Sequence, residues 1–250
     1  MYMRVVRLNI DADRVWELQE FYRDRLLPVL KDTEGCLFAS LLQPLGRDQD
    51  WISLTLWDAQ DRADRYADSG EYAHLVEEEE SYLAGSTEWR ARLAGDRGAQ
   101  PGASIGPVVE AYASNSPGGA EELRELAPAG LYLRIVALRV AEGRFDELRR
   151  RYEEVVVPAL YSTTGCRAAF LVEGVQLHER ALSVTIWDNE DAAIRYELSG
   201  EFDRLTRVLR EFFSGLYQWK LSLGPARDGE GVTGSDLDVS GYRVVTGAVL

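Results

Sequence analysis

The feature that most constrains this chain is an internal duplication. Residues 2–93 align with residues 132–223 at a constant offset of 130 positions, without a gap, and about 30 of the 92 aligned pairs are identical. This period exceeds the roughly 20–50 residues of a solenoid unit, so we interpret it as one small domain that was duplicated and fused. The identical pairs include Tyr2/Tyr132, Arg4/Arg134, Tyr22/Tyr152, Pro28/Pro158, Gly35/Gly165, Cys36/Cys166, Trp57/Trp187 and Tyr66/Tyr196.

Charge and hydropathy exclude several classes of partner. The net charge of −14 argues against nucleic acid and anionic membrane surfaces, because both bind to basic faces. No apolar run reaches the roughly 18 residues of a membrane span, and residues 1–6 lack the long apolar core of a signal peptide. We therefore expect no nucleic-acid partner, no membrane partner and a cytoplasmic location.

Hydrophobic periodicity predicts the same six elements in each half, in the order strand, helix, strand, strand, helix, strand. The first helix carries a late proline, Pro28 or its copy Pro158, where a kink or an early stop is expected. The second helix is interrupted at 69–71, where Ser69 can cap a new start. The strands of the first half are expected at 3–10, 36–43, 51–57 and 88–93, and the last of them is repeated at 218–223.

The duplication also predicts the domain boundaries. We expect a first repeat over 1–94, a linker over 95–130, a second repeat over 131–224 and a C-terminal extension over 225–250. The linker and the extension each contain a short apolar piece, at 107–112 and at 242–245. We interpret these pieces as matched extra strands, which either lengthen a sheet or cross to the other repeat.

The element order βαββαβ is the ferredoxin-like pattern. Its two helices cover one face of the sheet and leave the other face bare, so that face must be buried against something else. A second copy in the same chain is the obvious cover. The sequence therefore predicts an α+β fold in which two ferredoxin-like βαββαβ repeats form one pseudo-symmetric α+β barrel.

Short motifs shared by the halves resemble the antibiotic biosynthesis monooxygenase family of the dimeric α+β barrel superfamily. They are Gly35-Cys36, the run Thr55-Leu56-Trp57-Asp58 and the run Ser69-Gly70-Glu71, each with its copy in the second half. In that family two chains pair sheet to sheet, and here the fusion would supply both. The resemblance implies one cavity per half between sheet and helices, lined by the tryptophan of the third strand. It also implies a cofactor-free reaction in which a deprotonated phenolic substrate supplies electrons to molecular oxygen.

Trp57 and Trp187 match that family tryptophan and are our first candidate catalytic residues. Alternation along a strand puts Thr55 on the face of Trp57, and Thr185 on the face of Trp187, opposite an apolar face. A hydroxylated face capped by an indole is what a cavity wall requires, so Thr55 and Thr185 are predicted to contact substrate. The alternative is that the indole only fills the barrel.

Arg4 and Arg134 are duplicated cations in an otherwise apolar strand, where a buried charge needs a partner. They are candidates to hold an anionic, enolate-like substrate, and the alternative is a structural ion pair. Tyr66 and Tyr196 point inward by helical phase and are candidates to shape the pocket or donate a hydrogen bond. By contrast, the acidic run 77–80 is typical of a solvated helix face.

Histidine chemistry is not duplicated, since His74 and His178 have no histidine at the equivalent position. The heme-degrading branch of the superfamily uses an asparagine and a histidine at positions that here are Val6/Val136 and Val76/Thr206, so heme binding is disfavoured. The sequence contains no P-loop, dinucleotide fingerprint or metal-ligand cluster, and we expect no cofactor and no metal site. Cys36 and Cys166 are expected to be small buried residues, with a reactive or paired thiol as the alternative.

The function predicted from these observations is a cofactor-independent monooxygenase-like activity on a small aromatic or quinol-type molecule. A non-catalytic ligand-binding or structural barrel is the first alternative, and an isomerase or lyase on the same scaffold is the second. The expected partners are a small-molecule substrate and a second copy of the fused barrel in a homodimer.

Overall fold

The computed structural model describes residues 1–45, 50–83, 108–113, 131–175, 178–214 and 238–249. Within them the chain is an α+β protein built from two repeats. The first repeat comprises β1 (Tyr2–Leu8), α1 (Val15–Phe21), the π-helical turn η2 (Tyr22–Leu26), α2 (Leu27–Asp32), β2 (Cys36–Pro44), β3 (Trp51–Trp57), α3 (Gln60–Ala67) and α4 (Gly70–Glu80). Strand β4 (Val108–Ala113) follows it.

The second repeat has the same order of elements. It comprises β5 (Tyr132–Arg139), α7 (Phe145–Arg151), the π-helical turn η3 (Tyr152–Val156), α8 (Val157–Tyr161), β6 (Cys166–Gly174), β7 (Arg180–Trp187), α9 (Glu190–Leu198) and α10 (Glu201–Leu209). Strand β8 (Asp238–Val249) follows it. Short 3-10 turns cover Ala12–Arg14 and Arg210–Phe212. None of the described helices is long and apolar enough to span a membrane.

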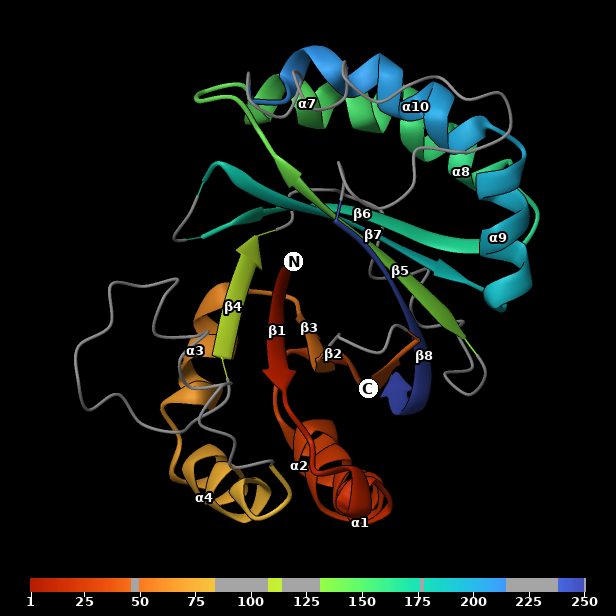
Figure 1. The fold of residues 1–250 in the computed structure, drawn as a ribbon. Helices are drawn as coiled ribbons and strands as arrows, with labels where there is room; N and C mark the ends of the chain where they lie inside the picture. Colours follow the sequence, from red (N-terminus) through yellow and green to blue (C-terminus); the bar gives the residue numbers. More distant parts are fainter. Residues whose placement is uncertain (46–49, 84–107, 114–130, 176–177, 215–237, 250) are drawn as a thin grey trace.

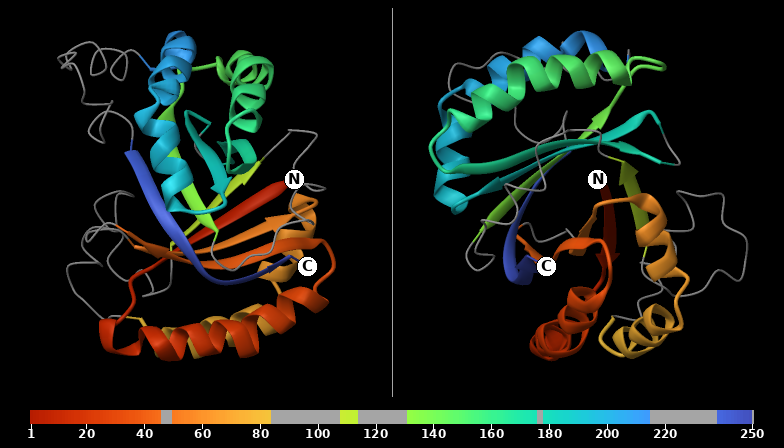
Figure 2. Two further views of the ribbon diagram at one scale, coloured as in Figure 1. Left: turned by 90° about the vertical axis from the view of Figure 1, so that its right-hand side faces the viewer. Right: turned by 180° about the vertical axis from the view of Figure 1, so that it is seen from behind.

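The described strands close into one barrel in the order β1-β3-β2-β8-β5-β7-β6-β4. The helices of the first repeat cover the outside of one half of the barrel, and those of the second repeat cover the opposite side (Figure 1, Figure 2). This arrangement confirms the predicted pair of ferredoxin-like repeats that share a barrel.

The two extra strands cross between the repeats. Strand β4 pairs with β1 of its own repeat and with β6 of the other, while β8 pairs with β5 and with β2. The apolar pieces at 107–112 and 242–245 therefore mark strands that cross to the other repeat. The strands predicted at 88–93 and 218–223 lie outside the described residues, and the place beside β1 is occupied by β4.

The barrel interior is one apolar cluster shared by both repeats. An eight-stranded barrel is just wide enough for side chains to fill it, and here the aromatic side chains of Phe38, Phe170 and Tyr242 are all buried in it. The cluster consists of Met3, Val5, Phe38, Leu42, Ile52, Leu54, Leu56, Leu131, Leu133, Ile135, Ala168, Phe170, Val172, Leu182, Val184, Ile186, Tyr242 and Val244.

Alternate residues of the same strands face the helices. This outer face of the barrel carries Arg4, Ser53, Thr55 and Trp57 in the first repeat, and all four are buried. Because the side chains of a strand alternate, the apolar residues between them point into the barrel. The alternation predicted for the third strand is therefore confirmed, with the hydroxylated face directed at the helices.

Two local features explain residues that the duplication retained. Gly35 and Gly165 adopt φ of 88° and 92° at the turn before β2 and β6, a region that favours glycine. A Cβ at Gly165 would also lie 2.6 Å from the Cβ of Ala192. Each π-helical turn ends two residues before a proline, and the wider turn accommodates the missing N–H. The helix therefore continues past Pro28 to Asp32 instead of stopping early.

We expect the barrel to unfold as one unit, because its interior belongs to both repeats. Replacing Phe170 by alanine should cost about 3–5 kcal/mol of unfolding free energy, and Phe38→Ala should cost a similar amount. Denaturant titration followed by tryptophan fluorescence should show a single transition for the wild type and both variants. Two separate transitions, of which Phe170→Ala shifts only one, would contradict a shared core.

Candidate functional site

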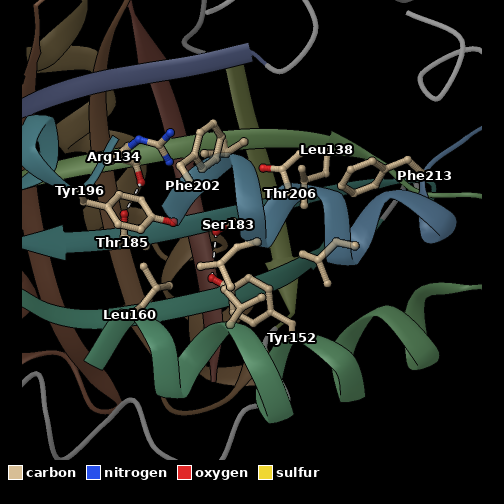
Figure 3. A pocket seen from close by; sticks show the side chains of 14 residues that line it. Arg134, Leu138, Tyr152, Leu160, Ser183, Thr185, Tyr196, Phe202, Thr206 and Phe213 are labelled. Carbon is tan, nitrogen blue, oxygen red and sulfur yellow. Dashed lines mark hydrogen bonds between the residues drawn. The ribbon is translucent and has the colours of Figure 1, made fainter. Parts of the chain in front are cut away.

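A cavity lies in the second repeat, between its helices and the outer face of its sheet (Figure 3). Water molecules can be centred within about 40 Å³ of this cavity. The empty space between the lining atoms, part of which is open to solvent, is about 440 Å³. By the first measure the cavity holds roughly three water molecules. Its lining consists of Arg134, Val136, Leu138, Tyr152, Val156, Leu160, Ser183, Thr185, Tyr196, Phe202, Leu205, Thr206, Leu209 and Phe213.

Arg134 is the charged residue of this lining. Its side chain is only 3% exposed, and its Nε donates to Oε1 of Glu197 over 2.5 Å. The guanidinium carbon lies 4.1 Å above the centre of the Phe202 ring. Its Nη2 is buried and has no hydrogen-bond partner among the described residues. A buried donor without an acceptor is costly, so this nitrogen is the natural contact for an acceptor that enters the cavity.

Two tyrosines supply hydroxyls to the same space. The Tyr152 hydroxyl is 2.9 Å from Oγ of Ser183, which faces it from β7 (Figure 3). The Tyr196 hydroxyl points toward the middle of the lining residues (Figure 3) and has no hydrogen-bond partner within the described part of the chain. Burial raises the pKa of both phenols well above the ordinary value, and Arg134 opposes this for Tyr196. Both groups are therefore neutral hydrogen-bonding groups at physiological pH.

Trp187 lies behind the cavity and is not part of its lining. The indole is fully buried, its ring centre is 5.1 Å from that of Tyr196, and its Nε1 donates to Oγ1 of Thr185 over 2.8 Å. Thr185 also lies 3.4 Å from the carbonyl oxygen of Arg134. The tryptophan therefore positions Tyr196 and Thr185, which do line the cavity.

The first repeat contains the equivalent residues but connects them differently. Trp57 again donates to Thr55 over 2.9 Å and packs on Tyr66, with 5.3 Å between ring centres. Arg4 contacts a tyrosine instead of a carboxylate, since its Nη2 is 3.3 Å from the Tyr72 hydroxyl. The residue equivalent to Glu197 is Ala67, which explains why Arg4 lacks that ion pair.

Glu79 departs from the sequence-based interpretation of its helix. Glu77 is exposed as expected for a solvated face, but Glu79 is only 5% exposed, and its Oε1 has no hydrogen-bond partner in the described residues. The run is amphipathic because Glu79 lies one and two turns from Leu75 and Tyr72, on the side of α4 that faces the sheet. Burial raises the pKa of Glu79 from 4.5 to about 7.

The family of this chain follows from comparison of its sequence with known protein families. The family model for antibiotic biosynthesis monooxygenases matches residues 1–78 and again residues 131–207. The chain belongs to the antibiotic biosynthesis monooxygenase family. Each match contains one complete set of the duplicated Arg, Thr, Trp and Tyr residues described above. No curated protein is significantly similar in sequence.

Solved structures with this fold include further monooxygenase-like proteins. A proposed monooxygenase from Lactobacillus acidophilus superposes with a TM-score of 0.64 at 9% identity, over 99% of this chain and 95% of that one. A proposed monooxygenase from Fusobacterium nucleatum gives 0.65 at 7% identity, over 99% and 94%. An anthrone oxidase-like protein gives 0.57 at 12% identity, over 99% and 92%. At these identities the likeness shows the fold alone.

The structure brings several predicted site residues of this family member together in each repeat. Arg134, Thr185 and Tyr196 line one cavity, and Trp187 supports them from behind. The predicted site residues do not include Tyr152 and Ser183, although both line the cavity and present hydroxyls to it. The signal was available, because both residues are duplicated and Ser183 shares the strand face of Thr185.

The two cysteines and His74 do not line the cavity. Cys36 and Cys166 are free and buried, and burial raises the pKa of each thiol to about 12. His74 is on the solvent side of α4, with its Nε2 3.0 Å from Oε1 of Glu78. Among the described residues, no three His, Cys, Asp or Glu side chains are grouped to hold a metal ion. The absence of heme and other cofactors stays a prediction.

The hydrogen bond under the tryptophan predicts a selective loss of stability. Thr185→Val keeps the shape of the side chain but leaves the buried Trp187 N–H without an acceptor, which should cost about 1–3 kcal/mol. Thr185→Ser retains the hydroxyl and should lose less. Unfolding free energies from denaturant titration compare the two variants, and equal stability of Thr185→Val and wild type would contradict this role.

Because the Glu79 carboxyl group is buried, we expect the unfolding free energy to decrease as pH rises. The pKa of about 7 in the folded state exceeds the ordinary value of 4.5, so the favourable contribution is complete below 4.5 and is lost as pH rises through 7. Because each pKa unit corresponds to about 1.4 kcal/mol, the total is roughly 3 kcal/mol. Glu79→Leu should remove this loss, which denaturant titrations at pH values between 5 and 8 can measure. A pH dependence identical to that of wild type would contradict the prediction.

Proposed function

We propose that the protein is a cofactor-independent monooxygenase that oxidises a small quinol or phenol in the cavity of the second repeat. The observation that carries this proposal is the buried Nη2 of Arg134, which has no hydrogen-bond partner among the described residues. A guanidinium N–H in a largely apolar site favours an anionic oxygen over a neutral one. The family to which the chain belongs supports the reaction type, and the lining supports the substrate class.

The residues of the cavity would then have separate roles. Arg134 binds the oxygen of the deprotonated substrate, while the Tyr196 hydroxyl donates a hydrogen bond to the same oxygen or to a second one. Tyr152 and Ser183 present a paired hydroxyl group on the opposite wall, and Thr185 and Trp187 hold the site in shape. Leucine and phenylalanine side chains surround these groups and exclude water, which strengthens the electrostatic contacts.

The electrons for the reaction come from the substrate. For hydroquinone as the simplest case, one oxygen atom forms a new C–O bond on the ring and the other leaves as water. The product is a hydroxyquinone, and the substrate supplies all four electrons that reduce O₂. The protein has only to stabilise the oxyanion and position the ring beside O₂. Such a task matches a site that has one cation and several neutral hydroxyls.

The size of the cavity limits the substrate. Water molecules can be centred within only about 40 Å³ of the cavity. A ligand with one aromatic ring therefore requires side chains of α10 to move, and a ligand with three fused rings would require a much larger movement. We therefore assign the site to single-ring compounds. A homodimer of the fused barrel and a cytoplasmic location complete the proposal, although the site itself needs neither.

A non-catalytic ligand-binding barrel is the second candidate, and one contact favours it. The Arg134–Glu197 ion pair neutralises the guanidinium over 2.5 Å, which weakens its attraction for a substrate anion. Glu197 is 42% exposed, however, so solvent screens the carboxylate more than the guanidinium. Binding without turnover would identify this second candidate.

We expect Arg134→Ala to weaken binding of hydroquinone in the second repeat by tenfold or more. Truncation of a buried ionic partner typically costs about 2–5 kcal/mol of binding. Calorimetric titration measures the affinity, and an oxygen electrode measures the rate of O₂ consumption with hydroquinone. Thermal stability of each variant is recorded in parallel to separate binding from folding.

Arg195→Met is the matched control, because Arg195 lies on the exposed side of α9 and should change neither quantity. The equivalent variant of the first repeat, Arg4→Ala, should leave the second-repeat affinity unchanged. If Arg134→Ala lowers the melting temperature but retains full affinity and O₂ consumption, the arginine is structural and the proposal is wrong.

A further inference from the structure

The two repeats hold their duplicated arginine through different nitrogen atoms. In the first repeat, Nη2 of Arg4 donates to the Tyr72 hydroxyl over 3.3 Å. In the second repeat, Arg134 donates through Nε to Oε1 of Glu197, and its Nη2 has no hydrogen-bond partner within the described residues. The polar partner has thus moved from one nitrogen of the guanidinium group to another.

Two substitutions account for this change. The residue equivalent to Tyr72 is Phe202, and the residue equivalent to Glu197 is Ala67. Phe202 keeps a ring beside the guanidinium group, with 4.1 Å between the ring centre and the guanidinium carbon, but it offers no hydroxyl. Glu197 supplies a carboxylate that Ala67 cannot. Arg134 and Phe202 both line the cavity, so the substitutions leave Nη2 as a donor to a ligand there.

The ion pair has a defined orientation. Arg134 lines the cavity and is 3% exposed, whereas Glu197 is not part of the lining and is 42% exposed. Burial raises the pKa of Tyr196, which also lines the cavity, and Arg134 opposes this. Burial and then Glu197 raise the pKa of Tyr132 to about 12. The pair therefore directs its positive end at the cavity and its negative end away from it.

This orientation changes which ligand charge the site prefers. A lone guanidinium group favours an anionic oxygen, but here the ligand oxygen on Nη2 and Oε1 of Glu197 on Nε would share one guanidinium group. The donors of that group form a compact, rigid fork, so a negative charge on the ligand would be repelled by the carboxylate at short range. A neutral oxygen accepts the same hydrogen bond without this repulsion, and its burial costs less than that of an ion.

We propose that Phe202 and Glu197 are the specificity-determining residues of the second-repeat site. Phe202 leaves Nη2 of Arg134 open to a ligand oxygen. Glu197 balances the charge of the arginine, so that the site admits uncharged phenols and quinols and excludes aromatic carboxylates. This inference rests on the proposed function, and it specifies the form in which the substrate enters, before it is deprotonated.

The experiment compares two single-ring probes, phenol and benzoate, on the full-length chain. At neutral pH benzoate is an anion and phenol is uncharged. Calorimetric titration gives the dissociation constant of each probe, and wild type should bind phenol more tightly. Glu197→Gln keeps an acceptor for Nε of Arg134 but removes the negative charge. The dissociation constant of benzoate should therefore fall tenfold or more, while that of phenol changes little.

A second variant tests whether the probes use Nη2 of Arg134. Phe202→Tyr introduces the hydroxyl that the first repeat places on this nitrogen of Arg4. We expect the dissociation constants of both phenol and benzoate to rise tenfold or more, with no decrease of the melting temperature. If Phe202→Tyr binds both probes as tightly as wild type does, the probes do not use this donor and the inference is wrong.

Glu190→Gln is the matched control for the loss of charge. Glu190 is on the same helix as Glu197 and also raises the pKa of Tyr132, but its replacement retains the carboxylate that holds Arg134. The ratio of the two dissociation constants should stay unchanged in this variant. Melting temperatures are recorded for all variants, because a purely structural Glu197 would change stability and would affect both probes alike.

The outcomes separate this inference from the proposed function. If Glu197→Gln leaves the ratio of the benzoate and phenol dissociation constants unchanged, the inference is wrong, even where wild type consumes O₂ with hydroquinone. If Glu197→Gln gains benzoate binding and Phe202→Tyr loses both probes, but wild type consumes no O₂ with hydroquinone, the two specificity residues stand and the proposed oxidation fails.

Discussion

Burial of the two bare sheet faces against each other is the constraint on which the rest of the structure depends. Each repeat covers only one face of its sheet with helices, and an exposed apolar face of that size would aggregate. The barrel solves this by placing the apolar phase of the strands from both repeats in one interior around Phe38 and Phe170. Strands β4 and β8 then join the repeats, since each pairs with a strand of the other.

This closure determines where chemistry is possible. With the interior filled by apolar side chains, polar residues remain on the outer face of the barrel, under the helices. There the hydroxylated phase of β3 and β7 meets tyrosines that η2, η3, α3 and α9 direct inward. The duplicated tryptophan has a supporting position in this arrangement, because its N–H donates a hydrogen bond to a threonine of its own strand.

Duplication in one chain allows the two sites to diverge, which two identical chains cannot do. Arg134 has a carboxylate partner from α9 and lines a cavity together with Leu209, whereas Arg4 has a tyrosine partner and the residue equivalent to Leu209 is the buried Glu79. Each substitution is small, but burial changes the protonation equilibrium of a carboxyl group strongly.

The sequence by itself determined the repeat, the order of the elements and the phase of the strands, because a gapless duplication and an alternation of period two are properties of the chain. It therefore predicted the shared barrel and named Arg134, Thr185 and Tyr196 as candidate site residues. Only the tertiary structure decided which groups meet. The ion pair of Arg134 depends on the packing of α9, and the burial of Glu79 on the rotation of α4. Sequence alone assigned that glutamate to solvent, because a run of four acids does not reveal which one faces the sheet.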